Sequence, residues 1–313
     1  MRLVRHLKDL PHKDLKDGSV VTIGSFDGFH CGHSKLLDKV LSKSQSMSVP
    51  SILMSFEPSP KEFFSTTNPP ARLMRFREKF EFLDSLGIDI FYCPRFSREM
   101  QKIRSIDFIR QLLVQGMNAR HIIVGDDFRF ARKREGSIQD FQKTQESLGF
   151  NVEKVDSIYK QGVRVSSTAI RSALANGNLK LATSLLGRLY RMSGRIIKGR
   201  QVGRNLGYPT ANVDLRRRQS AVKGVYAVKV SGLKEGVISG IASVGIRPTY
   251  GLTKPILEVY LLDFKRDVYG EYIHIDFIKH IRDEIKFDTE KDLINAMNED
   301  LKNARSIFSN ENS

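Results

Sequence analysis

Gly24-Ser25-Phe26-Asp27-Gly28-Phe29-His30-Cys31-Gly32-His33 follows an apolar, β-rich run and precedes a helical pattern. The free N–H groups and the dipole at such a strand-to-helix junction favour an anionic phosphate. Two histidines add hydrogen-bond donors that can follow negative charge as it builds during group transfer, and Gly32 permits a close backbone approach. This stretch therefore predicts a phosphate-binding loop in an α/β domain.

Outward from this loop, residues 1–175 alternate β-rich runs with helical patterns, as a parallel α/β sheet requires. The expected strands are Val20 to Phe26, Ser51 to Phe56, Ile88 to Cys93, His121 to Gly125 and Asn151 to Val155. Helical spacing covers Lys35 to Leu41, Glu78 to Leu86 and Ile106 to Leu113, with Gly87 and Gly116 as expected C-terminal caps. The pattern indicates a Rossmann-like nucleotide domain.

The sequence pattern changes near Gly187, after two short helical segments, Ser166 to Leu174 and Leu179 to Leu186. We therefore expect one domain over residues 1–187 and a second over residues 188–313. The second contains short β runs at Ser193 to Ile197, Gly224 to Val230, Ser239 to Val244, Ile256 to Phe264 and Ile273 to Ile278. They predict a small antiparallel Greek-key β-barrel, followed by a terminal α-helix that Thr289 and Asp292 cap. Its core face would carry Leu293, Met297, Leu301, Ala304 and Phe308.

The bulk composition supports two folded domains in 313 residues, with 40% hydrophobic and 27% charged residues. A formal charge of +16, spread over both halves, predicts an anionic partner, for which nucleotides fit as well as nucleic acid. We interpret Arg216-Arg217-Arg218 as a solvated turn, because no aromatic platform flanks it.

Two cysteines exclude a disulfide framework, and no apolar stretch approaches the roughly 18 residues of a membrane span. We expect a cytoplasmic protein.

A second phosphate-binding motif, Val165-Ser166-Ser167-Thr168-Ala169-Ile170-Arg171, lies at another strand-to-helix junction. Its hydroxyls, N-terminal amides and arginine suit phosphate, although a serine cap on an ordinary helix is the simpler interpretation of this motif alone. Metal ligation by His30, Cys31 and His33 is a further alternative, but their spacing matches no common zinc pattern. The pairing of the two motifs favours a nucleotide site.

With these motifs, the N-terminal half resembles bacterial bifunctional riboflavin kinase/FMN adenylyltransferase, also called FAD synthetase. Phe56-Glu57-Pro58-Ser59-Pro60, Pro70-Ala71-Arg72-Leu73 and Val124-Gly125-Asp126-Asp127-Phe128-Arg129-Phe130 match as well. The sequence departs from the family at Ala131, where many relatives have glycine, and trivially at Val165.

This resemblance implies an ATP site in a nucleotidyltransferase domain. His30 and His33 would hold the ATP phosphates, and Ser166, Ser167, Thr168 and Arg171 would grip them from the opposite side. Asp127 and Arg129 would line the nucleotide pocket, and Gly24 and Asp27 would belong to the same loop. FMN already carries an anionic phosphate, so its adenylylation needs alignment, Mg²⁺ and positive charge rather than a general base.

The C-terminal half carries a second constellation, in which Gly194 to Gly199 runs into Gly203-Arg204-Asn205-Leu206-Gly207-Tyr208-Pro209-Thr210-Ala211-Asn212. The glycines suit a phosphate-binding flap, and the side-chain oxygens of Thr210 and Asn212 suit Mg²⁺. This run resembles the riboflavin kinase signature, which extends the family resemblance over nearly the whole chain. Further matches are Gly224 to Ala227, Val244 to Thr249, Leu257 to Tyr260, Val268 to Gly270 and Arg282 to Glu284.

The kinase resemblance implies that Glu258 is the general base, because a neutral ribityl hydroxyl must lose its proton as it attacks ATP. Without the resemblance, Glu258 is simply a surface residue of a strand. The ATP and flavin site would include Lys198, Gly199, Gly203, Arg204, Gly207, Thr210, Asn212 and Arg282. Arg282 could equally be a solvated helix charge.

Together the two halves predict an enzyme that uses riboflavin, FMN and ATP with Mg²⁺ and makes FMN and then FAD. One alternative is an adenylyltransferase for a different phosphorylated substrate, because the histidine motif is shared across the superfamily. Another is a basic nucleic-acid-binding protein with the barrel as its platform. We expect neither a nucleic-acid nor a membrane partner, and the sequence leaves the oligomeric state open.

Overall fold

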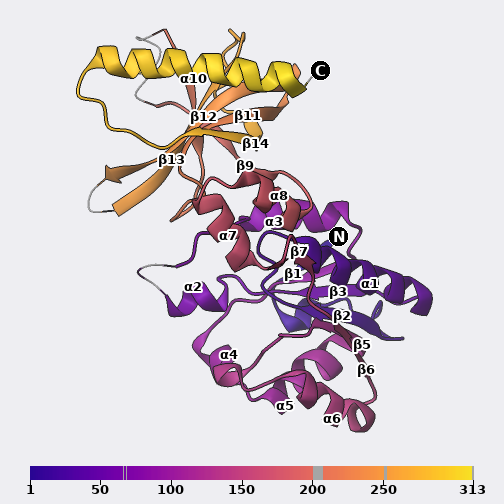
Figure 1. The fold of residues 1–313 in the computed structure, drawn as a ribbon. Coiled ribbons are helices and arrows are strands. Elements are labelled where there is room, and N and C mark those ends of the chain that lie inside the picture. Colours follow the sequence, from indigo (N-terminus) through magenta and orange to yellow (C-terminus); the bar gives the residue numbers. More distant parts are fainter. Residues whose placement is uncertain (66, 68, 200–206, 250–251, 312–313) are drawn as a thin grey trace. The chain divides into compact units, whose positions relative to one another are not determined.

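The computed structural model describes the chain except for residues 66, 68, 200–206, 250–251 and 312–313 (Figure 1). The chain forms two compact units. The first contains Met1–Pro70 and Met74–Ser166, and the second contains Ala71–Leu73 and Ser167–Ser313. The second unit thus includes the two helices that the sequence analysis assigned to the end of the first domain. A functional boundary between residues 187 and 188 stays a prediction.

The first unit contains a six-stranded parallel sheet in the order β1-β4-β3-β2-β5-β6 (Figure 1). Its strands are β1 (Arg2–Val4), β2 (Ser19–Ile23), β3 (Ser51–Met54), β4 (Ile90–Tyr92), β5 (Ala119–Gly125) and β6 (Asn151–Val155). Successive strand residues alternate between two cores: Val20 and Leu53 enter one, while Val21 and Ile52 enter the other. The apolar strands are therefore buried on both faces, as a parallel sheet requires.

Helices cover both faces of this sheet. α1 (Cys31–Met47) and α3 (Phe76–Ser85) supply Leu37 and Leu83 to one core. The π-helical segment η2 (Phe108–Gly116) and α6 (Ile138–Leu148) supply Phe108 and Phe141 to the other. The remaining elements are η1 (Leu7–Asp9), α2 (Pro60–Phe64), α4 (Arg98–Lys102), α5 (Ser105–Asp107), η3 (Arg132–Arg134) and the hairpin of β7 (Tyr159–Lys160) with β8 (Val163–Arg164).

The two glycines expected as helix caps behave differently. Gly87 adopts a left-handed φ of 81° just after α3, as a cap requires. Gly116 does not: the left-handed residue after η2 is Asn118. A Cβ atom at Gly116 would lie only 2.6 Å from the side chain of Leu7. The cap prediction for Gly116 was therefore wrong, because close packing rather than backbone conformation requires glycine there.

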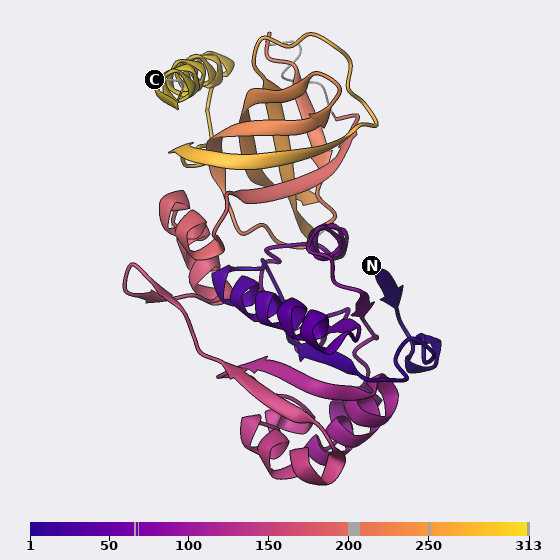
Figure 2. The same ribbon diagram turned by 90° about the vertical axis from the view of Figure 1, so that its right-hand side faces the viewer.

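The second unit contains a closed antiparallel barrel, shown in Figure 2, in the order β10-β13-β12-β11-β14-β9. Its strands are β9 (Tyr190–Ile197), β10 (Thr210–Asp214), β11 (Gly224–Leu233), β12 (Gly236–Thr249), β13 (Leu252–Leu261) and β14 (Tyr272–Arg282). The neighbouring order β14-β11-β12-β13 is the Greek-key order, with the fourth strand beside the first. The barrel prediction is confirmed, although β10 was not among the expected strands.

The helices in the described part of this unit are α7 (Ser167–Ala175), α8 (Leu179–Leu186) and the terminal α10 (Glu290–Glu311). The expected cap of α10 is present, since the Asp292 N–H donates to the Thr289 hydroxyl at 3.1 Å. Ala304 is buried against Val225 and Ile241 of the barrel, and Leu301 and Phe308 pack on the same cluster. The helix therefore covers part of the outer barrel surface.

Candidate active sites

The histidine loop leaves β2 at Ile23 and follows an unusual backbone path. Phe26 and Phe29 have left-handed φ values of 46° and 41°, and Gly28 has a φ of 90° between them. Such values are costly for phenylalanine, but both rings are buried, at 1% exposure. Burial of the two rings offsets this strain and fixes the loop that leads into α1.

The two histidines of the motif lie in direct contact at the start of α1. His30 is the N-cap, and its Nδ1 accepts a hydrogen bond from the His33 N–H at 3.3 Å. Their rings stack with centroids 3.6 Å apart and planes 13° from parallel. The Nδ1 atom of His33 is buried and makes no hydrogen bond within the described part of the chain.

Both imidazoles are neutral at neutral pH. Burial lowers the pKa of His30 to about 4, although nearby Asp27 and Asp127 oppose the shift. Burial, with the charges of His30 and Lys79, also holds the pKa of His33 well below its ordinary value. Because Nδ1 of His30 accepts a hydrogen bond, the ring proton belongs on Nε2. The pair can thus offer neutral N–H donors to a phosphate.

Other predicted residues of this loop have structural partners. Asp27 accepts a hydrogen bond from the Met74 N–H at 3.0 Å. A Cβ atom at Gly24 would lie 3.0 Å from the Phe26 ring, so glycine leaves room for that buried ring. Both residues therefore support the path of the loop, which is compatible with the ATP-binding role expected for them.

The expected pocket residues Asp127 and Arg129 follow β5 and are exposed. Asp127 lies 2.6 Å from Arg164, which also pairs with Asp126. Sequence reasoning missed Arg164, because an isolated arginine in a short hairpin carries no motif. Its charge lies close enough to lower the pKa of His30 slightly, so it adds positive potential near the histidines.

The second predicted phosphate motif spans the end of the first unit and the start of the second. Ser166 ends the first unit, whereas Ser167, Thr168 and Arg171 lie on α7 in the second. Arg171 donates from Nε to the backbone carbonyl of Ala71 at 2.6 Å. Its joint grip with the histidines on one ATP molecule stays a prediction.

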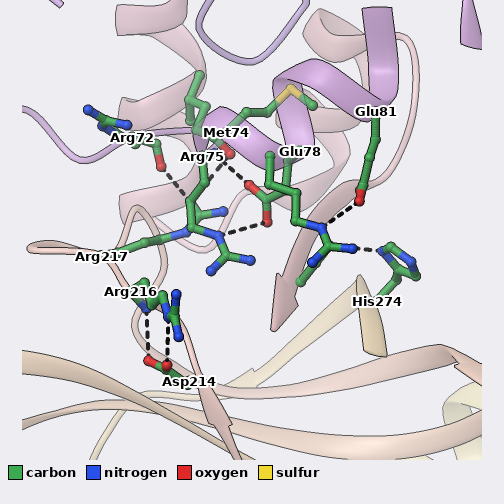
Figure 3. A network of polar contacts seen from close by, with 12 residues as sticks. Arg72, Met74, Arg75, Glu78, Glu81, Asp214, Arg216, Arg217 and His274 are labelled. Carbon is green, nitrogen blue, oxygen red and sulfur yellow. Dashed lines mark hydrogen bonds and ion pairs between the residues drawn. The ribbon is translucent and has the colours of Figure 1, made fainter. Parts of the chain in front are cut away.

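The arginine run 216–218 is not uniformly solvated, contrary to the sequence interpretation (Figure 3). Arg217 is 7% exposed and donates from Nη1 to the carbonyls of Arg72 and Leu73, at 2.6 and 3.4 Å. The same nitrogen lies 3.3 Å from the Tyr190 hydroxyl. Arg216 does fit the expectation, since it is 80% exposed and pairs only locally with Asp214.

The kinase residues meet on the outer face of the barrel. Ala211 and Val213 of β10, like Leu257 and Val259 of β13, are buried. Thr210, Asn212 and Glu258 alternate with them and therefore project from the opposite face of their strands. Asn212 is directly opposite Glu258 in the register, and Ser243 of β12 is opposite Glu258 on its other side. The expected Mg²⁺ ligands and the expected base thus share one surface.

A glycine makes this arrangement possible. A Cβ atom at Gly199 would lie 2.2 Å from Nδ2 and 2.7 Å from Oδ1 of Asn212, so the amide packs where a side chain would otherwise be. Lys198 is exposed, with its ammonium 6.0 Å from the Tyr269 ring centroid. Gly207 is exposed with a φ of 85°. The predicted residues Gly203 and Arg204 lie outside the described residues.

Arg282 has a clear structural partner. Its Nε and Nη2 atoms donate to the two carboxylate oxygens of Asp300, both at 2.8 Å, and Asp300 is buried on α10. The guanidinium also lies 5.5 Å from the Phe287 ring centroid. The alternative of a solvated helix charge was wrong, since Arg282 ends β14 and fastens it to α10. Its expected role near the flavin and phosphates stays a prediction.

A buried lysine is the second residue that sequence reasoning missed. Lys79 of α3 is 8% exposed and donates from Nζ to the Ser25 carbonyl at 2.6 Å, beside the histidine loop. A lysine among charged residues of an amphipathic helix reads as solvated. Only the buried residues around it, far apart in sequence, could have indicated otherwise.

Among the residues that the structure describes, no three His, Cys, Asp or Glu side chains are grouped so that they could hold a metal ion. The described helices also include none that is long and apolar enough to cross a membrane.

Sequence comparisons identify the family of both units. The profile of the FAD synthetase family matches residues 12–169, and that of the riboflavin kinase family matches residues 186–308. Bifunctional riboflavin kinase/FMN adenylyltransferase of Escherichia coli K12 is 43% identical, over 98% of both chains. The enzyme of that name from Haemophilus influenzae is 40% identical, over 98% of this chain and 99% of its own.

A structural comparison agrees on the fold. A solved structure from Streptococcus pneumoniae, described as a macrolide-efflux protein, superposes with a TM-score of 0.81 at 28% identity. The match covers 97% of this chain and 98% of that one, so the two share their whole architecture. The efflux description concerns that protein alone. From the two profiles and the full-length relatives, this chain belongs to the bifunctional riboflavin kinase/FMN adenylyltransferase family, with the FAD synthetase part first and the riboflavin kinase part second.

Proposed function

We propose that the barrel phosphorylates riboflavin at the Thr210, Asn212 and Glu258 surface, and that the first domain adenylylates FMN at the His30–His33 loop. Riboflavin kinase and FMN adenylyltransferase activities follow from the family. The observation that carries the residue assignment is the register, which sets Asn212 beside Glu258 on the same strand face. It joins the expected base to an expected ligand of the ATP-bound cation.

At the kinase site, Glu258 accepts the proton of the ribityl 5′-hydroxyl while that oxygen attacks the γ-phosphorus of ATP. The P–O bond to ADP breaks as the new ester bond forms. The oxygens of Thr210 and Asn212 are hard donors of the kind Mg²⁺ prefers, and glycine at position 199 leaves the space that the Asn212 amide occupies. When bound with ATP, Mg²⁺ supplies charge neutralisation for the phosphates.

At the adenylyltransferase site, an FMN phosphate oxygen attacks the α-phosphorus of ATP and pyrophosphate leaves. The nucleophile is already anionic, so no residue needs to remove a proton. His30 and His33 donate hydrogen bonds from neutral rings and stabilise charge that builds on the phosphates. Their burial favours this assignment, because a donor in a site shielded from water is worth more than an exposed one.

The kinase domain favours FMN over a different phosphorylated molecule as the acceptor in the adenylyltransferase reaction. A domain that makes FMN in the same chain supplies the acceptor that the other domain consumes. Incubation of the protein with riboflavin, ATP and Mg²⁺, followed by chromatography, should show FMN first and then FAD. Supplied FMN should also become FAD with release of pyrophosphate. If riboflavin gave FMN but no FAD, and supplied FMN also gave no FAD, the adenylyltransferase half of the proposal would be overturned.

A further inference from the structure

Lys79 occupies a position that the proposed chemistry does not yet use. Its side chain extends from α3 into the protein and reaches the carboxyl ends of two neighbouring strands of the parallel sheet. Nζ donates to the Ser25 carbonyl, just beyond β2, at 2.6 Å. It also lies 3.4 Å from the hydroxyl of Ser55, which follows β3 and is buried. One ammonium therefore links the ends of two strands where the histidine loop begins.

The loop beyond Ser25 needs such a link. Phe26, Gly28 and Phe29 all have left-handed φ values before His30 caps α1. A backbone under this strain keeps its path only if the surrounding structure over-determines it. A charge-assisted hydrogen bond to the Ser25 carbonyl is one of the stronger constraints available to a backbone group. Lys79 acts at the point where the chain enters the strained segment.

The position of Lys79 relative to the histidines adds a second argument. Its charge lies close enough to His33 to contribute to the lowered pKa of that imidazole. The Ser25 carbonyl that it holds also accepts a hydrogen bond from the Ser55 hydroxyl, at 3.4 Å. Lys79 and Ser55 are thus two buried polar side chains that reach one carbonyl, that of the exposed Ser25, and their hydrogen bonds matter because a buried polar group has no water to replace a lost partner.

We propose that Lys79 is a positioning residue of the adenylyltransferase site, whose buried ammonium holds the Ser25 carbonyl and so fixes the loop that presents His30 and His33. This inference rests on the proposed function of that loop. Lys79 acts through the loop and not by contact with the reacting atoms. Its loss should therefore lower the turnover number for FAD formation and change the KM for ATP far less.

The test compares Lys79→Met, Lys79→Arg and an exposed lysine of α6 replaced in the same way, Lys143→Met. We expect Lys79→Met to lower kcat for FAD formation about 100-fold, the cost of a small misplacement of catalytic groups. Lys79→Arg should retain more activity, because it keeps a donor and the charge. Lys143→Met should match the parent. Unfolding of each variant in urea, followed by circular dichroism, shows whether the first unit is folded, and riboflavin kinase activity, which uses the other unit, should not change.

A double-mutant cycle separates positioning from general damage. If Lys79 acts through the histidine loop, adding Lys79→Met to His33→Ala should cost less than about tenfold more. If the fold-losses in FAD formation of the two single variants multiplied in the double variant, the proposal for Lys79 would be overturned. Full FAD formation by Lys79→Met would overturn it as well. Failure of the parent protein to convert FMN to FAD would instead overturn the proposed function of the loop, so the two failures are distinguishable.

Discussion

The two proposed sites differ in how they would handle phosphate chemistry. The histidine loop is strained and buries Phe26, Phe29 and His30, and both imidazoles are neutral because burial lowers their pKa. The kinase residues lie half-exposed on the regular outer face of a barrel, where strand register alone brings Asn212 to Glu258. The histidine site depends on a loop with an unusual backbone path. The kinase site depends on the alternation of buried and outward-facing side chains along regular barrel strands.

The chemistry explains the difference. FMN reaches the first site as an anion, so the protein needs well-placed donors and no base. Riboflavin reaches the second site as a neutral alcohol, so a carboxylate must be able to take a proton and then lose it to solvent. Glu258 is half-exposed on the outer face of the barrel, which suits that role.

The largest effect that would sharpen this contrast is expected from Glu258→Gln. The change keeps the shape of the side chain but removes the base, and we expect riboflavin phosphorylation to fall about 1000-fold. Conversion of supplied FMN to FAD should not change. Glu299→Gln, at an exposed glutamate of α10, is the matched control. If Glu258→Gln had the same kinase activity as Glu299→Gln, Glu258 would be no more than a surface charge.

The next effect concerns the glycine beneath the Asn212 amide. In Gly199→Ala, the new methyl group would meet that amide at 2.2 Å and displace it. We expect kinase activity to fall about 100-fold, since a shift near 1 Å in a positioning group has that cost. Gly162→Ala adds a methyl group where no atom lies within 4 Å, and although its φ of 74° strains the β7–β8 hairpin of the first unit, kinase activity should not change. A fully active Gly199→Ala enzyme would exclude Asn212 as a cation ligand.

A smaller effect, on stability, tests the buried arginine of the second unit. Arg217→Ala removes hydrogen bonds from a charged donor to the Arg72 and Leu73 carbonyls, and should destabilise that unit by about 2 kcal/mol. Its neighbour offers the control, because Arg216→Ala removes only an exposed pair and should cost less than about 0.5 kcal/mol. Urea unfolding followed by circular dichroism measures both. Equal midpoints would contradict the structural role of Arg217.

The smallest effect tests the neutrality of the histidine loop. The folded-state pKa of His30 is about 4, below its ordinary 6.5, so the unfolded chain binds more protons between these values. Stability should therefore be lost as pH falls through this window, by about 1 kcal/mol from pH 7 to 5.5. His30→Asn keeps an N-cap acceptor and should remove the contribution of His30, while His33, whose pKa is also lowered, keeps its own contribution. The exposed His12→Asn should leave the full pH dependence in place, and an unchanged slope in His30→Asn would contradict the assignment.

Regular patterns in the sequence predicted most of the architecture. β6 begins and ends at the expected Asn151 and Val155, and the Thr289 cap of α10 is present. The strand that the sequence did not predict is β10, which contains Thr210 and Asn212 and follows the glycines interpreted as a flap. It has only five residues and follows a glycine-rich segment, so local propensity favoured a loop, whereas pairing with β9 and β13 makes it a strand.

The sites divide in the same way. Motifs pointed to His30, His33 and Glu258 as candidate site residues, because their chemistry is concentrated in short runs. Lys79, Arg164 and Arg217 were missed or misread, since each acts through residues distant in sequence. A lone lysine or arginine has the same local pattern whether it is solvated or buried, and only tertiary packing separates the two. Sequence motifs therefore identify candidate reacting residues better than they identify the buried residues that hold the backbone in place.

The most direct test of two independent sites is a mixing experiment with His30→Ala and Glu258→Gln proteins. Given riboflavin, ATP and Mg²⁺, the first alone should accumulate FMN and the second alone should make little of either product. Mixed in one tube, they should form FAD, because FMN made by one protein is adenylylated by the other. Loss of both activities in either single variant, or a mixture that forms no more FAD than its components, would contradict the account.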